Sequence, residues 1–117
     1  SRRVSAVASY LRQIFLALFD LRIHSILSED GLGESVSELY ARLRAEVTLI
    51  KQPPNVHPAA TFVHMMAGYD VGYYGYLWSE VYAHDIFASR FQAEGLQNPD
   101  TGMAYRRSIL QPGGGRE

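Results

Sequence analysis

The amino-acid sequence predicts an all-α fold of about four helices joined through a segment rich in glycine and tyrosine. Apolar residues recur every three to four positions along most of the chain, and capping and turn signals separate these periodic stretches. No stretch alternates apolar and polar residues as a half-buried strand does, and there is no internal repeat. A chain of 117 residues can bury one hydrophobic core, so we treat residues 1–117 as a single helical segment.

The composition is that of a globular protein, with 47% apolar residues, 20% charged residues, a formal net charge of -1 and no cysteine. This balance offers no basic face, so we expect no nucleic-acid partner. Without cysteine, disulfides and thiolate metal sites are impossible. Polar residues interrupt the apolar-leaning stretch from residue 6 to residue 27, and we therefore expect no membrane partner. The interruptions are Arg12, Gln13, Asp20, Arg22 and His24.

The first predicted helix begins near Val4 and runs for about 20 residues. Its apolar residues have the i, i+3, i+4, i+7 spacing of one helical face. Leu16, Phe19 and Ile23 widen this stripe, so we expect the helix to pack on more than one side. The face consists of Val4, Val7, Ala8, Leu11, Ile14, Phe15, Leu18 and Leu21.

A second helix is predicted to begin at a capping box. The residues Ser28–Gly31, with Gly33, break the first helical pattern. Ser35 and Glu38 then form the S-x-x-E signature, whose side chains bind the free amides of a helix start. The helix ends before Pro53–Pro54, because proline lacks an amide proton and has a fixed φ, and a loop follows. Its apolar face is Val36, Leu39, Tyr40, Leu43, Val47 and Ile50.

Two further helices are predicted in the second half of the chain. Residues 59–75 mix aromatic residues with glycine and favour neither helix nor strand. A third helix follows Tyr76 and ends at Gly95, which suits a C-terminal cap. Asn98–Pro99 is a helix-opening pair, with Asn as the N-cap and Pro in the first helical position. The fourth helix ends near Leu110, ahead of a proline-glycine stretch.

The tyrosines are the most unusual feature of the sequence. Residues 68–76 read GYDVGYYGY and hold four of the eight tyrosines. One interpretation is an array of phenol donors facing a cleft, and the other is a packing segment whose hydroxyls reach the surface. Gly68, Gly72 and Gly75 favour the first interpretation, since glycine permits positive φ or close backbone approach, which a plain packing segment does not need.

Other polar residues have both a chemical and a structural interpretation. His64 could donate to an oxyanion or a peptide carbonyl, or it could be a structural histidine. Glu80 and His84 share one helical face and could begin a metal site or form an ion pair, but there is no H-E-x-x-H motif and no third ligand, so we assign no metal ligand. Arg106 and Arg107 could complement a helix dipole or bind a carboxylate.

Longer stretches of the sequence resemble a known family. Residues 60–91, ATFVHMMAGYDVGYYGYLWSEVYAHDIFASRF, followed by GMAYRRSIL and QPGG, resemble the C-terminal part of the thimet oligopeptidase and neurolysin family of zinc metallopeptidases. YLRQIFLALFDLRIH and ELYARLRAEV resemble the preceding helices more weakly. The resemblance implies a multi-helical part of a catalytic domain that cuts short peptides in a deep channel. It also implies a zinc ion held by the two histidines of H-E-x-x-H and a later glutamate, all upstream of Ser1.

The resemblance also implies roles for single residues. In the family, the histidine of T-F-x-H and the tyrosines of G-Y-D-x-x-Y-Y-G-Y face the zinc, and these positions are His64, Tyr69, Tyr73 and Tyr76. Tyr76 and Tyr69 are expected to stabilise the oxyanion of the tetrahedral intermediate. His64 is expected to hold that oxyanion or a substrate carbonyl, and Tyr73 to contact the substrate main chain.

The neighbouring residues receive supporting roles. Gly68, Gly72 and Gly75 are expected to let the segment shift, so that substrates of different size are accepted. Tyr74 and Trp78 are interpreted as packing residues. In the family the chain continues beyond the proline-glycine element, so we expect truncation at both ends, with an exposed apolar face that favours self-association or contact with the upstream half of the polypeptide.

The sequence therefore predicts the C-terminal portion of a zinc metallo-oligopeptidase that acts on short peptides. Zinc belongs to the full-length parent, and the fragment alone is expected to be inactive, because it lacks the general base and the metal ligands. The alternative is a non-catalytic helical module that binds a peptide or another protein. The absence of cysteine and of a signal peptide favours a cytoplasmic location, with an organelle or the periplasm left open.

Overall fold

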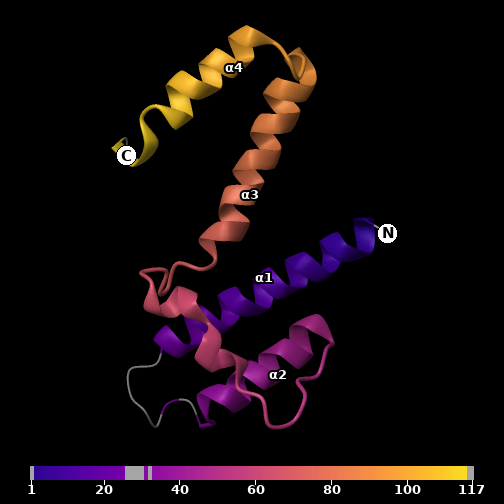
Figure 1. Ribbon diagram of the computed structural model, residues 1–117, viewed down its shortest axis with the longest axis vertical. Coiled ribbons are helices and arrows are strands. Elements are labelled where there is room, and N and C mark those ends of the chain that lie inside the picture. The colour runs from indigo at the N-terminus through magenta and orange to yellow at the C-terminus, as the bar shows by residue number, and fades with distance from the viewer. Residues whose placement is uncertain (1, 26–30, 32, 116–117) are drawn as a thin grey trace. The chain divides into compact units, whose positions relative to one another are not determined.

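The computed structural model describes residues 2–25, 31 and 33–115 (Figure 1). All regular elements in these residues are helical, which confirms the all-α prediction. The four α-helices are α1 (Arg2–His24), α2 (Val36–Thr48), α3 (Gly75–Ile86) and α4 (Pro99–Tyr105). Short 3₁₀ turns occupy Pro58–Thr61, Val63–Met66 and Gly113–Gly115, and π-helical turns occupy Phe87–Gln92 and Arg106–Leu110.

The chain divides into two compact units, residues 1–78 and residues 79–117. The first unit contains α1, α2, the turns that follow them and the start of α3. The second contains the rest of α3, α4 and the π-helical turns. In the described residues no helix is long and apolar enough to cross a membrane. The predicted break at residues 28–30 lies outside the described residues, as does the side chain of Val4.

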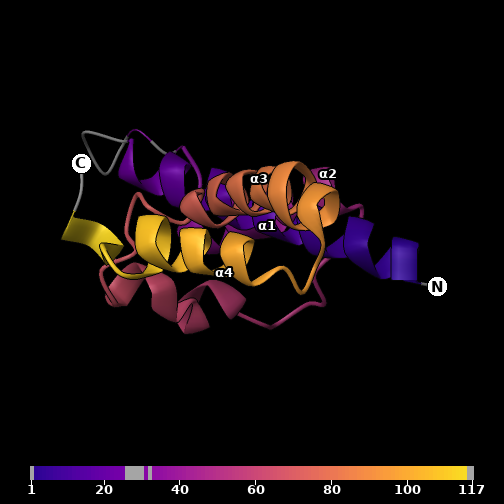
Figure 2. The same cartoon turned by 90° about the horizontal axis from the view of Figure 1, so that it is seen from above.

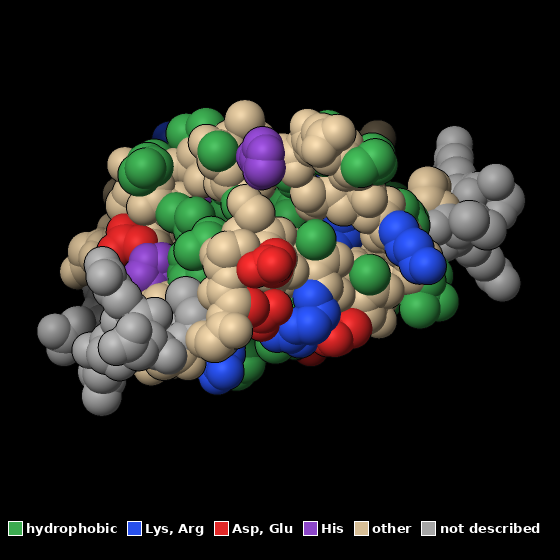
Figure 3. All heavy atoms as spheres, turned by 90° about the horizontal axis from the view of Figure 1, so that it is seen from below, with side chains coloured by type: hydrophobic (Ala, Val, Ile, Leu, Met, Phe, Trp, Pro, Cys, Tyr) green, Lys and Arg blue, Asp and Glu red, His purple; other side chains and the backbone are tan. Residues whose placement is uncertain are grey.

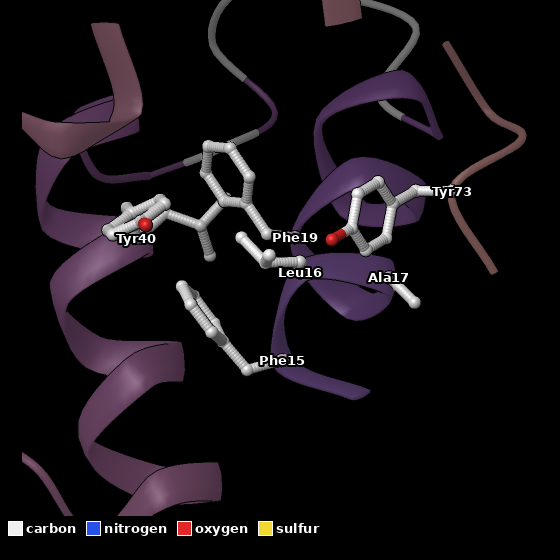
Figure 4. Packing of buried hydrophobic residues seen from close by; sticks show 7 residues of the cluster. Phe15, Leu16, Ala17, Phe19, Tyr40 and Tyr73 are labelled. Atoms are coloured by element: carbon white, nitrogen blue, oxygen red, sulfur yellow. The ribbon is translucent and has the colours of Figure 1, made fainter. Parts of the chain in front are cut away.

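The core of the first unit forms between α1 and α2, which lie side by side and run in opposite directions (Figure 1, Figure 2). The Tyr40 ring of α2 meets the rings of Phe15 and Phe19 edge-on, at centroid distances of 4.8 and 5.0 Å. Tyr40 and Tyr73 enter this cluster from opposite sides of the α1 residues (Figure 4). The buried apolar residues are Phe15, Leu16, Ala17, Phe19, Leu39, Tyr40 and Tyr73.

Only part of the apolar face predicted for α1 is buried in the structure. Leu16 and Phe19, which widened the apolar stripe, are in the core, whereas Val7, Leu18 and Leu21 are exposed. The reason is geometric, because α2 and the segment around Tyr73 both contact the strip that carries residues 15, 16, 19 and 20. The expectation that α1 packs on more than one side is confirmed, but the centre of the buried strip lies to one side of the predicted face.

Helix α2 begins at the predicted capping box. The Ser35 hydroxyl accepts the amide of Glu38 at 3.3 Å, and the Glu38 carboxylate accepts the amide of Ser35 at 2.8 Å. The two hydrogen bonds to Ser35 hold the pKa of Glu38 below its usual range. The predicted face is buried at Leu39 and Tyr40, while Val36 and Ile50 at its two ends are exposed.

Charged side chains on the surface pair with each other. Arg42 forms ion pairs with Glu34 at 2.6 Å and with Glu46 at 3.2 Å. Figure 3 shows one face of the molecule, on which acidic and basic side chains lie next to each other and apolar side chains are exposed between them. This pattern agrees with the near-zero net charge of the chain.

The second unit confirms the predicted caps. The Gly95 amide donates to the Phe91 carbonyl at 3.1 Å with φ at +105°, a conformation that suits glycine. The Asn98 side chain accepts the amide of Asp100 at 3.0 Å, and Pro99 is the first helical residue. The π-helical turns after α3 and α4 were not predicted, because the apolar spacing resembles that of an α-helix.

Candidate functional site

Four residues that the sequence singled out lie together in the first unit. The His64 ring is 5.9 Å from the Tyr69 ring, 5.2 Å from the Tyr73 ring and 5.9 Å from the Tyr76 ring, measured between centroids. The Tyr69 and Tyr76 rings stack at 5.8 Å with an interplanar angle of 14°. We refer to His64, Tyr69, Tyr73 and Tyr76 as the His–Tyr cluster.

Backbone turns bring the first two members of the cluster together. The 3₁₀ turn Val63–Met66 carries His64, whose carbonyl accepts the Tyr69 amide at 3.2 Å. Gly68 lies just before Tyr69 with φ at +80°. An L-residue rarely adopts this conformation, so glycine fits the reversal of the chain between the imidazole and the first phenol.

Two further turns place the remaining tyrosines. The Tyr69 carbonyl accepts the Gly72 amide at 3.0 Å, and the Tyr73 carbonyl accepts the Tyr76 amide at 3.2 Å. Inside the first of these turns, Val71 has φ at +61°. This is a strained conformation for a β-branched residue, and surrounding contacts must hold it.

The three glycines of the segment therefore differ in what they provide. Gly68 requires positive φ, as predicted. At Gly72 a Cβ atom would lie 3.4 Å from the Tyr69 carbonyl oxygen, which is ordinary van der Waals contact, and φ is not positive. At Gly75, the first residue of α3, a Cβ atom would meet open space. Their predicted role in substrate binding stays a prediction.

The three phenols of the cluster differ in how far they are exposed to solvent. Tyr73 is only 4% exposed and packs against Phe62 at 5.1 Å, whereas Tyr69 is 49% and Tyr76 42% exposed. Tyr73 is thus the tyrosine of the segment that packs into the core. Tyr74 and Trp78, which were interpreted as packing residues, are exposed. The contact of Tyr73 with a substrate main chain stays a prediction.

Two phenols of the cluster, Tyr73 and Tyr76, have raised pKa values. Burial raises the pKa of Tyr73, and the neighbouring Tyr76 raises it further against the lowering effect of Arg12. Desolvation also raises the pKa of Tyr76, together with the charge of Tyr69 and a side-chain hydrogen bond with it. A raised pKa keeps the proton on both hydroxyls near neutral pH, and a protonated phenol can donate a hydrogen bond.

The cluster borders a pocket of about 380 Å³. Its walls come from the cluster itself, the turn before it and one face of α1. Polar groups and apolar side chains both line it, which is the mixture expected of a site that orients a ligand. The lining residues are Arg12, Gln13, Leu16, Thr61, Phe62, Val63, His64, Tyr73 and Tyr76. A larger groove of about 760 Å³ between α1 and α2 is mainly apolar and contains no residue of the cluster.

One residue that sequence reasoning missed holds the segment in place. Asp20 of α1 is fully buried, and its carboxylate accepts the amides of Val71 at 3.0 Å and Tyr73 at 3.1 Å. His24, one turn later, places Nδ1 3.0 Å from the same carboxylate. An acidic residue inside the apolar stripe, four positions before a histidine, was the available signal, but it was interpreted only as an interruption of that stripe.

The described residues do not form a zinc site. Glu80 and His84 approach to 3.7 Å on the exposed side of α3, which fits the ion-pair interpretation. No group of three or more His, Cys, Asp or Glu side chains in residues 2–25 and 33–115 is placed to hold a metal ion. Arg106 and Arg107 are exposed in the π-helical turn after α4, and in residues 79–115 no described contact favours either of their interpretations.

Comparison with known proteins supplies the context for this cluster. The model of peptidase family M3 matches residues 1–117. The chain is 36% identical over 118 residues to oligopeptidase A of Escherichia coli strain K12. The alignment covers 100% of the chain and 17% of that protein. It is 35% identical over 114 residues to a thimet-like oligopeptidase of Dictyostelium discoideum, covering 97% and 16%. It is 34% identical over 121 residues to the chloroplastic/mitochondrial organellar oligopeptidase A of Arabidopsis thaliana, covering 99% and 15%. The chain thus spans about one sixth of these relatives.

Proposed function

Because this chain belongs to peptidase family M3, we propose that it is the C-terminal portion of a zinc-dependent metallo-oligopeptidase that hydrolyses peptide bonds in short peptides. Within that enzyme, the chain supplies substrate-binding and oxyanion-stabilising residues. The observation that carries the proposal is the His–Tyr cluster, in which one imidazole and three phenols meet and from which His64, Tyr73 and Tyr76 line a pocket.

The chemistry assigned to the cluster is hydrogen-bond donation. When water adds to the scissile carbonyl carbon, the C=O π bond breaks and negative charge develops on the oxygen. Donors that are already in position stabilise this charge most effectively. Tyr76 and Tyr69 suit the role, since both phenols are accessible and their rings stack together.

The other residues of the segment are assigned to the substrate. His64 holds a substrate carbonyl or the oxyanion from the opposite side, and Tyr73 contacts the substrate main chain from the pocket wall. Gly68, Gly72 and Gly75 allow small shifts of the segment that admit peptides of different size.

Zinc is assigned to residues outside this chain. Zinc sites in peptidases use three protein ligands, and the described residues do not supply such a set. The chain alone is therefore proposed to be inactive and to depend on the upstream half of the same polypeptide. Exposed apolar residues on α1, such as Val7 and Leu18, support such a contact, or self-association when that half is missing. A cytoplasmic location is proposed for the parent.

The test compares the full-length parent with the 117-residue chain in cleavage of a quenched fluorescent oligopeptide. We expect cleavage only by the full-length protein, and a chelator should stop it. Tyr76→Phe in that protein should lower kcat about 100-fold or more, because one oxyanion donor is lost. Tyr74→Phe removes an exposed hydroxyl two residues away and should leave kcat unchanged.

Two results would contradict the proposal. If Tyr76→Phe retained full turnover with zinc bound, the donor role of the cluster would be wrong. If the full-length protein bound no zinc and cleaved nothing, the cluster would belong to a peptide-binding or packing module instead.

A further inference from the structure

We propose that Asp20 positions Tyr69 and Tyr76 by binding the backbone between them, and is thereby needed for turnover although it does not touch the substrate. This inference rests on the proposed function of the two phenols. It assigns a role to a fully buried carboxylate that the proposed chemistry does not otherwise use.

The contact is made at the middle of the segment. The Asp20 oxygens accept the amides of Val71 at 3.0 Å and Tyr73 at 3.1 Å, one oxygen for each amide. Hydrogen bonds to a carboxylate are stronger than those between neutral groups, and the protein interior strengthens them further. The carboxylate therefore fixes the backbone on both sides of Gly72.

The fixed amides are linked to both phenols by short turns. The amide of Gly72, between the two bound amides, donates to the Tyr69 carbonyl at 3.0 Å. On the other side, the carbonyl of Tyr73 accepts the Tyr76 amide at 3.2 Å. A shift at residues 71–73 would thus move Tyr69 and Tyr76 relative to each other and disturb their stacking at 5.8 Å.

Backbone strain at Val71 gives a second reason for the carboxylate. With φ at +61°, Val71 adopts a conformation that a β-branched residue leaves when nothing opposes it. The hydrogen bond from its amide to Asp20 opposes that relaxation. Without the carboxylate, relaxation of Val71 would displace the turn that runs from Tyr69 to Gly72.

His24 holds the carboxylate itself. Its Nδ1 atom lies 3.0 Å from the Asp20 side chain and 2.8 Å from the Asp20 backbone carbonyl, one helical turn away. The ring lies at the surface end of this arrangement, with 30% of its side chain exposed. His24 is therefore a support for Asp20 and offers a milder way to disturb the same contact.

The main test is Asp20→Asn in the full-length protein. The substitution keeps the size of the side chain but replaces one acceptor oxygen with an NH₂ group, which cannot accept an amide proton. We expect kcat per bound zinc to fall about 10- to 100-fold, as misplacement of a reacting group by about 1 Å does. KM should rise by a smaller factor than kcat falls, because Tyr73 is the one assigned substrate contact in the displaced backbone.

The matched control is Asp70→Asn, which removes the same charge from an exposed position in the same segment. We expect it to leave kcat near that of the unsubstituted protein. An equal fall in kcat for Asp70→Asn and Asp20→Asn would overturn the inference, since loss of charge near the segment would then explain both results.

A double-mutant comparison separates positioning from a merely structural role. If Asp20 acts through Tyr76, then Asp20→Asn in a Tyr76→Phe background should lower kcat by much less than it does alone. If the two effects multiply in full, Asp20 acts independently and the inference is wrong. If Tyr76→Phe alone has no effect, the proposed function fails instead. Should Asp20→Asn not fold, His24→Asn carries the same comparison, with a smaller fall in kcat expected.

Discussion

The rings of Tyr69 and Tyr76 stack at 5.8 Å within 14° of parallel, although six residues separate them in the sequence. The stack couples the titration of one phenol to the other. Desolvation, the charge of Tyr69 and a hydrogen bond with Tyr69 all raise the pKa of Tyr76. Tyr69 therefore contributes, after desolvation, to the raised pKa of the Tyr76 hydroxyl that is assigned to oxyanion binding.

The first prediction concerns this coupling. A phenol donates only while protonated, and because the pKa of Tyr76 is raised, activity that depends on Tyr76 should persist beyond the ordinary tyrosine value of about 10 and be lost at higher pH. Tyr69→Phe removes the charge and the hydrogen bond that raise the pKa of Tyr76. The alkaline limb of the kcat profile should then move to lower pH. A limb that stays in place or moves upward would show that Tyr69 does not influence Tyr76.

The second prediction tests which strip of α1 is buried. Leu16 is 3% exposed and Leu18 is 44% exposed, although both belong to the predicted apolar stripe. Leu16→Ala should lower the free energy of unfolding by about 2 to 5 kcal/mol, because it leaves a cavity in the core. Leu18→Ala should cost about 0.5 kcal/mol or less. Urea denaturation of the 117-residue chain measures both, and equal losses would contradict the observed packing.

The third prediction compares two glycines of the tyrosine segment. A Cβ atom added at Gly68 or at Gly75 would have no neighbour within 4 Å, but only Gly68 has positive φ. Gly68→Ala should therefore destabilise the chain by about 1 to 2 kcal/mol through backbone strain alone. Gly75→Ala, at the start of α3, should be neutral or stabilise it by up to about 1 kcal/mol. Thermal unfolding monitored by circular dichroism checks the opposite signs, and a loss at both positions would refute the distinction.

The fourth prediction concerns stability at alkaline pH. Burial raises the pKa of Tyr40 and Tyr73, so the folded chain holds these protons more tightly than the unfolded chain does. The resulting stabilisation is complete below the unfolded pKa near 10 and is lost as pH rises through the folded pKa values. The urea concentration at the midpoint of unfolding should therefore decrease as the pH is raised from about 9 to about 11.

The matched variants locate this effect. Tyr73→Phe removes one of the two buried phenols and should make the fall in urea midpoint shallower. Tyr74→Phe removes an exposed phenol and should leave the fall unchanged. If both variants behaved alike, titration of the buried phenols would not be the cause.

Local signals predicted the helices well, because each is set by neighbouring residues. Ser35 with Glu38, and Asn98 with Pro99, form their caps within four positions of sequence. The apolar stripe of α1 was visible too, but not which part of it α2 and Tyr73 would cover. That choice depends on contacts between distant segments, which helical periodicity does not contain.

The sequence singled out the four residues of the His–Tyr cluster, but not Asp20, which holds the backbone of the cluster in place, or the strained Val71. Family resemblance singled out His64, Tyr69, Tyr73 and Tyr76, and the structure brings all four rings together. The strained φ of Val71 left no trace in the sequence, since valine ordinarily avoids that conformation. An acid in an apolar stripe shows that a partner is needed, but the partner of Asp20 is a pair of backbone amides, which have no sequence signature.

The bond between Asp20 and Tyr73 spans 53 positions of the chain, and this separation bears on the order of folding. Closing so long a loop costs chain entropy, which packing of the intervening elements must offset. Helices and tight turns form from local contacts. The hydrogen bond between Asp20 and Tyr73 instead requires that α1 and the tyrosine segment have already come together. The His–Tyr cluster should therefore reach its final geometry late, after α1 has docked, and folding kinetics would follow its completion through the tyrosine signal.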